Sequence, residues 1–204
     1  MTTEAFMLSP KYPDCTVVSY IHAPSAELNI PVRRAIIVCP GGGYQFLSDR
    51  EAEPVALQYF AAGLNVFILN YSIQDKAHDS APLIEAALAV RHVRENAEKY
   101  HIDPRYVFIT GFSAGGHVAA CCGTMWKDAA VPIQNTLLYA NALAAAGVPF
   151  EYHVYPSGVH GLSLANRETW VGQAQLDVPA IAGWIHEAIR YVLEFEARGE
   201  GSRT

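Results

Sequence analysis

Apolar runs alternate with stretches of helical spacing along most of the chain. The continuous apolar run Ala35–Cys39 and the segment Asn65–Asn70, which has four apolar residues between two asparagines, are typical of strands buried on both faces of a parallel sheet. Arg105–Thr110 and the weakly alternating segment Phe150–Tyr155 are predicted as further strands. Thr16–Ile21 precedes the first parallel strand and is predicted as an antiparallel strand at the edge of the sheet.

Helical spacing fills the intervals between these strands. The segments predicted as helices are Glu51–Ala62, Pro82–Tyr100, Gly116–Cys122, Ile133–Ala146 and Pro179–Ala197. This alternation predicts an α/β fold with a mostly parallel sheet, helices on both faces, and a site beyond the carboxyl ends of the strands. Residues 1–197 contain no linker or repeat and are expected to form one domain, and residues 198–204 are expected to be disordered.

The segment Gly111-Phe-Ser-Ala-Gly115 has the form of a nucleophile elbow. A strand-like run leads into it and a helical run leads out, as a sharp strand-to-helix turn requires. The two glycines remove side chains that would clash in such a turn, so that Ser113 is held out where a substrate can reach it. The simpler interpretation is a glycine-rich turn with an incidental serine. The flanking strand and helix favour the nucleophile.

A glycine-rich loop, Pro40-Gly-Gly-Gly-Tyr44, follows the apolar run that ends at Cys39. Its backbone N–H groups can approach a negatively charged oxygen without side chains in the way, as an oxyanion hole requires. We assign this role to the N–H groups of Gly42 and Gly43, together with that of Ala114. A phosphate-binding loop is the competing interpretation, but neither G-x-x-x-x-G-K-[ST] nor a G-x-G-x-x-G motif opening into a helix is present.

A histidine near the C-terminal end is the candidate general base. His160 stands beside a glycine in the loop Pro156–Gly161, which follows a predicted strand. The weaker candidates, on or beside predicted helices, are His92, His101, His117 and His186. The sequence has no H-E-x-x-H motif and no Cys/His cluster at zinc spacing, so we expect neither a metal nor another cofactor.

From about residue 30 to about residue 165 the sequence resembles α/β-hydrolase-fold carbohydrate esterases of the acetylxylan-esterase-like type. The resemblance rests on Pro40–Tyr44, Asn70-Tyr71, Gly111–His117, Val131-Pro132, Ala146–Phe150 and Val154–Gly161. It implies a three-layer α/β-hydrolase fold, with a sheet between two layers of helices. It also implies a serine carboxylesterase that acts on small acyl esters, including O-acetyl groups on sugars or xylan. It also implies a triad of Ser113, Asp128 and His160, since Asp128-Ala-Ala-Val-Pro132 matches the family's acid motif.

The sequence departs from that family between Ser113 and Asp128, where relatives carry more of the sheet. A helix from Ala114 to Cys122 moves the chain about 13 Å from the serine, and the four residues after Gly123 return about 13 Å at best. We therefore expect a sheet shortened by about two strands. Three alternatives remain. Asp128 reaches His160; or another carboxylate takes its place, or His160 works without one; or the chain is a truncated relative in which catalysis is weakened or lost. The tight geometry favours a long distance between the Asp128 carboxylate and Nδ1 of His160, with Asp128 capping a helix instead.

Composition excludes several other classes of function. The chain of 204 residues has 14 Lys plus Arg against 20 Asp plus Glu, a net charge of −6, which argues against nucleic acid or an anionic membrane as a partner. The N-terminal segment lacks a secretion-signal pattern, and no apolar run is long enough to span a bilayer, so a cytoplasmic location is expected. The four cysteines, Cys15, Cys39, Cys121 and Cys122, show no disulfide-framework spacing.

The substrate side is less defined by the sequence. Tyr44, Tyr71 and Trp126 are candidates for lining a pocket for the alcohol part of a small-molecule or saccharide ester. Two functions compete with an esterase: a hydrolase-like scaffold without activity, and a peptidase of the same fold. Homo-oligomerisation is left open.

Overall fold

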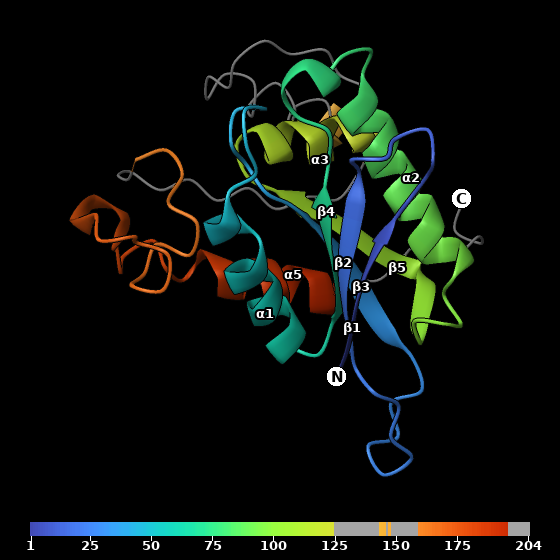
Figure 1. Ribbon diagram of the computed structural model, residues 1–204. Helices are drawn as coiled ribbons and strands as arrows, with labels where there is room; N and C mark the ends of the chain where they lie inside the picture. The colour runs from blue at the N-terminus through green and yellow to red at the C-terminus, as the bar shows by residue number, and fades with distance from the viewer. Residues whose placement is uncertain (125–142, 146, 148–158, 196–204) are drawn as a thin grey trace.

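Five strands form one sheet in the computed structural model, which describes residues 1–124, 143–145, 147 and 159–195 (Figure 1). They are β1 (Thr2–Met7), β2 (Thr16–Ile21), β3 (Arg33–Cys39), β4 (Asn65–Asn70) and β5 (Ile102–Gly111), in the order β1-β2-β4-β3-β5. β3 pairs in parallel with β4 and β5, and β2 is antiparallel to both of its neighbours. Four of the five strands therefore share one direction.

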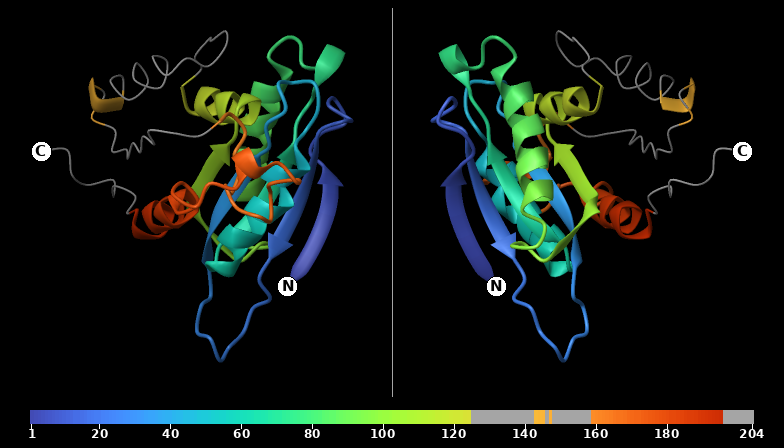
Figure 2. Two further views of the ribbon diagram at one scale, coloured as in Figure 1. Left: turned by 90° about the vertical axis from the view of Figure 1, so that its left-hand side faces the viewer. Right: turned by 90° about the vertical axis from the view of Figure 1, so that its right-hand side faces the viewer.

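Helices cover both faces of this sheet (Figures 1 and 2). They are α1 (Glu53–Ala61), α2 (Ala81–Glu95), α3 (Ala114–Thr124) and α5 (Trp184–Glu194), with short 3-10 turns at Asp49–Glu51, Gln74–Lys76 and Ala174–Leu176. Alternate residues of β3 explain the two layers, because Ile37 packs in the cluster that contains α2 and α3 residues, whereas Ile36 packs in the cluster that contains α1 and α5 residues. The predicted three-layer α/β architecture is confirmed.

The edge of the sheet differs from the prediction. Thr16–Ile21 is antiparallel as expected, but it lies one strand in from the edge, because Thr2–Met7 pairs along its whole length. Most side chains of that first strand are exposed, so it carries no apolar pattern by which it could be recognised. Backbone hydrogen bonds to β2 keep it in place, together with Phe6, which packs against the core, and Glu4, which forms an ion pair with Lys99 at 2.9 Å.

Helix ends also differ from the prediction. α2 ends at Glu95, five residues early, and the chain then turns so that Tyr100 is buried without continuing the helix. α5 begins at Trp184, later than expected, and α1 begins at Glu53 after a 3-10 turn. The strand predicted at Phe150–Tyr155, the tail from residue 198 and all but 143–145 of the helix predicted at Ile133–Ala146 lie outside the described residues.

No helix in the described ranges combines the length and the apolar composition that crossing a bilayer requires.

Candidate active site

Ser113 lies in the turn between β5 and α3, with a backbone φ of +49°. That left-handed conformation is uncommon for a residue with a side chain and marks a strained turn. A Cβ atom on Gly111 would lie 2.1 Å from the carbonyl oxygen of Gly115, and one on Gly115 would lie 2.1 Å from the carbonyl oxygen of Cys39. Neither distance is sterically allowed, so the clash that the sequence predicted at both glycines is confirmed.

Substituting Gly115 with alanine tests this packing. We expect Gly115→Ala to lower the free energy of unfolding by about 3 kcal/mol or more, because the methyl group overlaps two backbone carbonyls at the end of β3. Gly116→Ala is the matched control, since its added Cβ atom would lie 3.1 Å from the carbonyl oxygen of Gly111, a much milder overlap than the one at Gly115, and alanine favours a helix. Urea unfolding of both variants measures the difference. Equal stability of Gly115→Ala and the wild type would contradict this account of the elbow.

The glycine-rich loop after β3 lies directly against the elbow. A Cβ atom on Gly41 would be 2.7 Å from the carbonyl oxygen of Phe112 and 3.0 Å from Cβ of Ser113, so only glycine allows this approach. Backbone φ values of +136° at Gly42 and +60° at Gly43 then turn the chain back on itself. The start of the loop therefore lies next to the serine.

The sequence predicts an oxyanion hole made by the backbone N–H groups of Gly42, Gly43 and Ala114. The N–H groups of Gly42 and Gly43 form no hydrogen bond with any residue in the described part of the chain. That of Ala114 is at the N-terminus of α3, where helices leave N–H groups without intrahelical partners. By contrast, the Gly41 N–H donates to Oε2 of Glu51 at 2.9 Å and is already satisfied.

His160 meets Ser113 although the two residues are 47 positions apart in the sequence. Its Nε2 lies 2.7 Å from Oγ of Ser113, within hydrogen-bonding distance for a serine hydroxyl that donates to a neutral imidazole. Among the described residues, no carboxylate forms a hydrogen bond or ion pair with His160. Asp128, the expected acid, lies outside the described residues, as does Trp126.

The loop that carries His160 is held from two sides. Nη1 of Arg50 donates to the carbonyl oxygens of Gly161, at 3.0 Å, and Thr169, at 3.3 Å. Oγ of Ser163 donates to the carbonyl oxygen of Arg50 at 2.6 Å, and Nε1 of Trp184 donates to the carbonyl oxygen of Ser163 at 2.8 Å. The histidine loop is thus bonded both to the turn before α1 and to the start of α5.

Sequence reasoning missed the importance of that turn. Glu51 was placed only as the first residue of a helix, and Arg50 had no assigned role. Charged residues at a helix N-terminus are ordinary solvent-facing groups, so no local pattern distinguishes these two. Their contacts with distant loops become visible only in the tertiary structure.

The two tyrosines proposed for a substrate pocket have different surroundings. Tyr71 is only 2% exposed and donates its hydroxyl to the carbonyl oxygen of Pro40 at 2.6 Å, while burial raises the pKa of its phenol. It supports the glycine-rich loop from the core, so the expectation that it lines a pocket is corrected. Tyr44 is half-buried, with its hydroxyl 2.7 Å from Nδ1 of His117 and its ring edge-on to Tyr71.

The remaining candidate histidines are engaged elsewhere or lie on the surface. Nε2 of His92 is 3.0 Å from the hydroxyl of Tyr100, and burial lowers the pKa of His92. His186 is exposed on α5. Within the described ranges, no three His, Cys, Asp or Glu side chains gather as a metal site would require.

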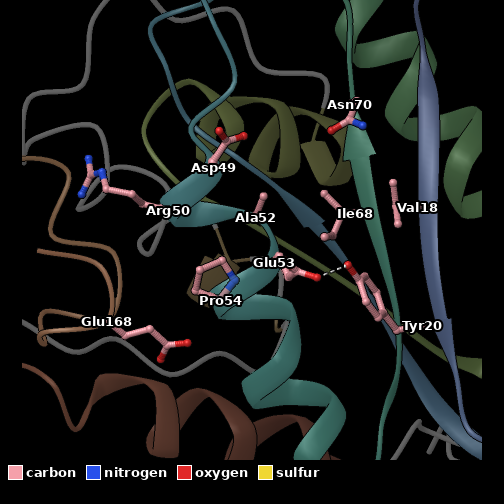
Figure 3. A pocket seen from close by; sticks show the side chains of 10 residues that line it. All are labelled: Val18, Tyr20, Asp49, Arg50, Ala52, Glu53, Pro54, Ile68, Asn70 and Glu168. Atoms are coloured by element: carbon pink, nitrogen blue, oxygen red, sulfur yellow. Dashed lines mark hydrogen bonds between the residues drawn. The ribbon is translucent and has the colours of Figure 1, made fainter. Parts of the chain in front are cut away.

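A pocket of about 560 Å³ lies beside the turn before α1 (Figure 3). Its lining residues come from β2, β4, this turn, the start of α1 and the loop before α5: Val18, Tyr20, Asp49, Arg50, Ala52, Glu53, Pro54, Ile68, Asn70 and Glu168. The hydroxyl of Tyr20 donates to Oε1 of Glu53 at 2.9 Å, and burial together with this bond raises the pKa of Tyr20 to about 12. Glu53 therefore faces this pocket, which neither Ser113 nor His160 lines.

Known proteins of similar sequence include enzymes that act on xylan and its esters. The BD-FAE family matches residues 21–142. Endo-1,4-beta-xylanase B of Butyrivibrio fibrisolvens is 27% identical over 233 residues, covering 76% of this chain and 35% of the relative. Acetylxylan esterase of Xylanibacter ruminicola is 34% identical over 110 residues, covering 53% of this chain and 23% of the relative. This chain spans about a third or less of the length of the curated relatives that it matches.

The solved structures establish the fold. MGS-M1, an alpha/beta hydrolase enzyme from a Medee basin deep-sea metagenome library, matches with a TM-score of 0.87 at 31% identity. The match covers 94% of this chain and 96% of that one. The alignment to the xylanase is 233 residues long although it takes up 76% of a 204-residue chain, so that relative carries a segment that this chain lacks. The location of the shortening between Ser113 and Asp128 stays a prediction.

Proposed function

Because the chain belongs to the BD-FAE family and to the α/β hydrolases, we propose that it is a serine carboxylesterase that cleaves small acyl esters. The observation that carries the proposal is the 2.7 Å distance between Oγ of Ser113 and Nε2 of His160, beside the glycine-rich loop. A hydroxyl bonded to an imidazole, next to backbone donors that have no partner among the described residues, is the arrangement that acyl transfer requires.

The proposed reaction has two steps. His160 accepts the Ser113 proton at Nε2 as Oγ attacks the ester carbonyl, and the N–H groups of Gly42, Gly43 and Ala114 bind the resulting oxyanion. The imidazolium then gives its proton to the leaving alcohol, which departs and leaves an acyl-enzyme. Water, deprotonated by the same imidazole, attacks this acyl-enzyme; the carboxylic acid is released as the imidazolium returns its proton to Oγ of Ser113.

Asp128 is the candidate for the acid that orients His160; the alternative, which the short interval after Ser113 favours, is that Asp128 caps a helix and the base works without it. The assignment rests on the chain order of nucleophile, acid and base, which is the order of α/β hydrolases. A carboxylate bonded to Nδ1–H would hold the ring with Nε2 free to accept the serine proton.

The proposed substrate class is an O-acetylated sugar or xylan fragment. Both curated relatives described above have names that refer to xylan. One of them is named as a glycosidase, but glycosidases place two carboxylates across the scissile bond, whereas the pair here is a serine and a histidine. The Ser113–His160 pair therefore favours the ester over the glycosidic bond.

Hydrolysis of p-nitrophenyl acetate by the wild type, beside Ser113→Ala, tests the proposal. We expect turnover by the wild type only, faster for the acetyl than for the butyryl ester, and release of acetate from acetylated xylan. An inactive scaffold would give equal rates for both proteins. A peptidase would release p-nitroaniline from peptide anilides and leave acetylated xylan unchanged.

A further inference from the structure

The carboxylate of Glu51 is buried between the two loops that meet at Ser113. Glu51 is 3% exposed, and its Oε2 accepts a hydrogen bond from the Gly41 N–H at 2.9 Å. A Cβ atom on Gly41 would lie 2.6 Å from Oε2, and one on Gly161 would lie 4.0 Å from Oε1. The same carboxylate therefore bonds to the start of the glycine-rich loop and lies near the residue that follows His160.

Space-filling alone does not explain a buried glutamate at position 51. Removing a carboxylate from water is costly unless hydrogen bonds to it compensate, and an apolar side chain would fill the volume without that cost. A hydrogen bond from a backbone N–H to a carboxylate is shorter and stronger than one to a neutral acceptor. The bond to Gly41 thus fixes this loop more firmly than packing alone would.

The neighbouring residue extends the same connection. Nη1 of Arg50 donates to the carbonyl oxygen of Gly161 at 3.0 Å, and the carbonyl oxygen of Arg50 accepts the Ser163 hydroxyl at 2.6 Å. Both residues belong to the 3-10 turn Asp49–Glu51, directly before α1. One rigid turn is therefore bonded to the loop with the backbone donors and to the loop with the imidazole.

We propose that Glu51 is a positioning residue: it holds the Gly41 end of the glycine-rich loop in a fixed position relative to the elbow and the histidine loop. The inference rests on the proposed esterase function. Because Glu51 occupies the Gly41 N–H, the next two N–H groups, of Gly42 and Gly43, are left to face the oxygen that becomes negative when Ser113 attacks. Such donors act mainly in the transition state, so the loss of Glu51 lowers kcat much more than it changes KM.

Three substitutions at Glu51, with a control two residues away, test this role. In Glu51→Gln the amide oxygen still accepts the Gly41 N–H, whereas Glu51→Leu fills the volume without an acceptor and Glu51→Ala removes both. With p-nitrophenyl acetate we expect kcat to fall about a hundredfold in the leucine and alanine variants, with KM within about threefold. We expect Glu51→Gln to stay within about tenfold of the wild type. Glu53→Ala, which faces the pocket of Figure 3, is expected to keep the wild-type kcat.

Amide exchange provides a readout that does not depend on turnover. The Gly41 N–H, followed by NMR in deuterated water, is expected to exchange faster in Glu51→Leu than in Glu51→Gln, whose exchange stays near that of the wild type. A wild type without esterase activity would contradict the proposed function but leave this comparison intact.

An active wild type together with an unchanged kcat in Glu51→Leu would overturn the positioning role. A rise in KM at constant kcat would overturn it too, since that pattern would assign Glu51 to substrate binding. Should Glu51→Ala fail to fold, the comparison between the leucine and glutamine variants still decides.

Discussion

Replacing Ser113 with alanine is expected to lower kcat for p-nitrophenyl acetate by at least about 10⁴-fold, because it removes the atom that forms the acyl-enzyme. We expect the thermal midpoint to stay within a few degrees of the wild type. The Ser113 hydroxyl bonds only to the exposed His160 among the described residues, so its loss leaves no buried group unpaired. Alanine has the same difficulty as serine with the φ of +49°, so backbone strain does not change.

Steady-state kinetics and a thermal melt of both proteins measure these effects. Labelling with an alkyl fluorophosphonate is a second readout, since the wild type is expected to react at Ser113 and the variant is not. Unchanged turnover in Ser113→Ala would assign the nucleophile to another residue. Loss of the folded state would show that the serine has a structural role that its contacts do not indicate.

His160→Ala is expected to lower turnover by about 10³-fold or more, because no other described side chain is in a position to accept the Ser113 proton. His186→Ala is the matched control, since His186 is exposed on α5 and its removal leaves the Ser113–His160 pair intact. Kinetics of the two variants with the same ester make the comparison. Near-normal turnover in His160→Ala would place the base elsewhere, and His153, which falls in the strand predicted at Phe150–Tyr155, would be tested next.

Asp128→Asn tests the third member of the proposed triad by the same kinetics with the same ester. An acid that orients the imidazole makes this change costly, because asparagine favours the wrong tautomer of His160. If the base works without Asp128, the variant keeps the wild-type rate.

The sequence was most informative where the requirement is local. The elbow is such a case: Ser113 lies between glycines, after a strand and before a helix. Both glycines are required for a steric reason, since Cβ atoms on Gly111 and Gly115 would lie about 2 Å from backbone oxygens. The apolar runs at Ala35–Cys39 and Asn65–Asn70 likewise became the central pair of parallel strands, because burial on both faces requires an unbroken apolar stretch.

Features without a burial pattern were missed or misplaced. Thr2–Met7 is a strand although most of its side chains face solvent, because its backbone pairs with β2. Tyr71 was expected at a pocket, but its ring is in the core and its hydroxyl supports the loop at Pro40. Residue type alone does not determine which of several tyrosines faces a substrate.

By itself, the sequence determined the strands and helices that carry a burial pattern and the kinds of residue that the site needs, because steric and burial requirements act over a few neighbouring positions. Only the tertiary structure decided which distant residues meet: His160 with Ser113 across 47 positions, and Glu51 with Gly41 and Gly161. Those meetings depend on how the loops pack beyond the ends of the strands. Long-range packing of this kind leaves no periodic trace in the sequence.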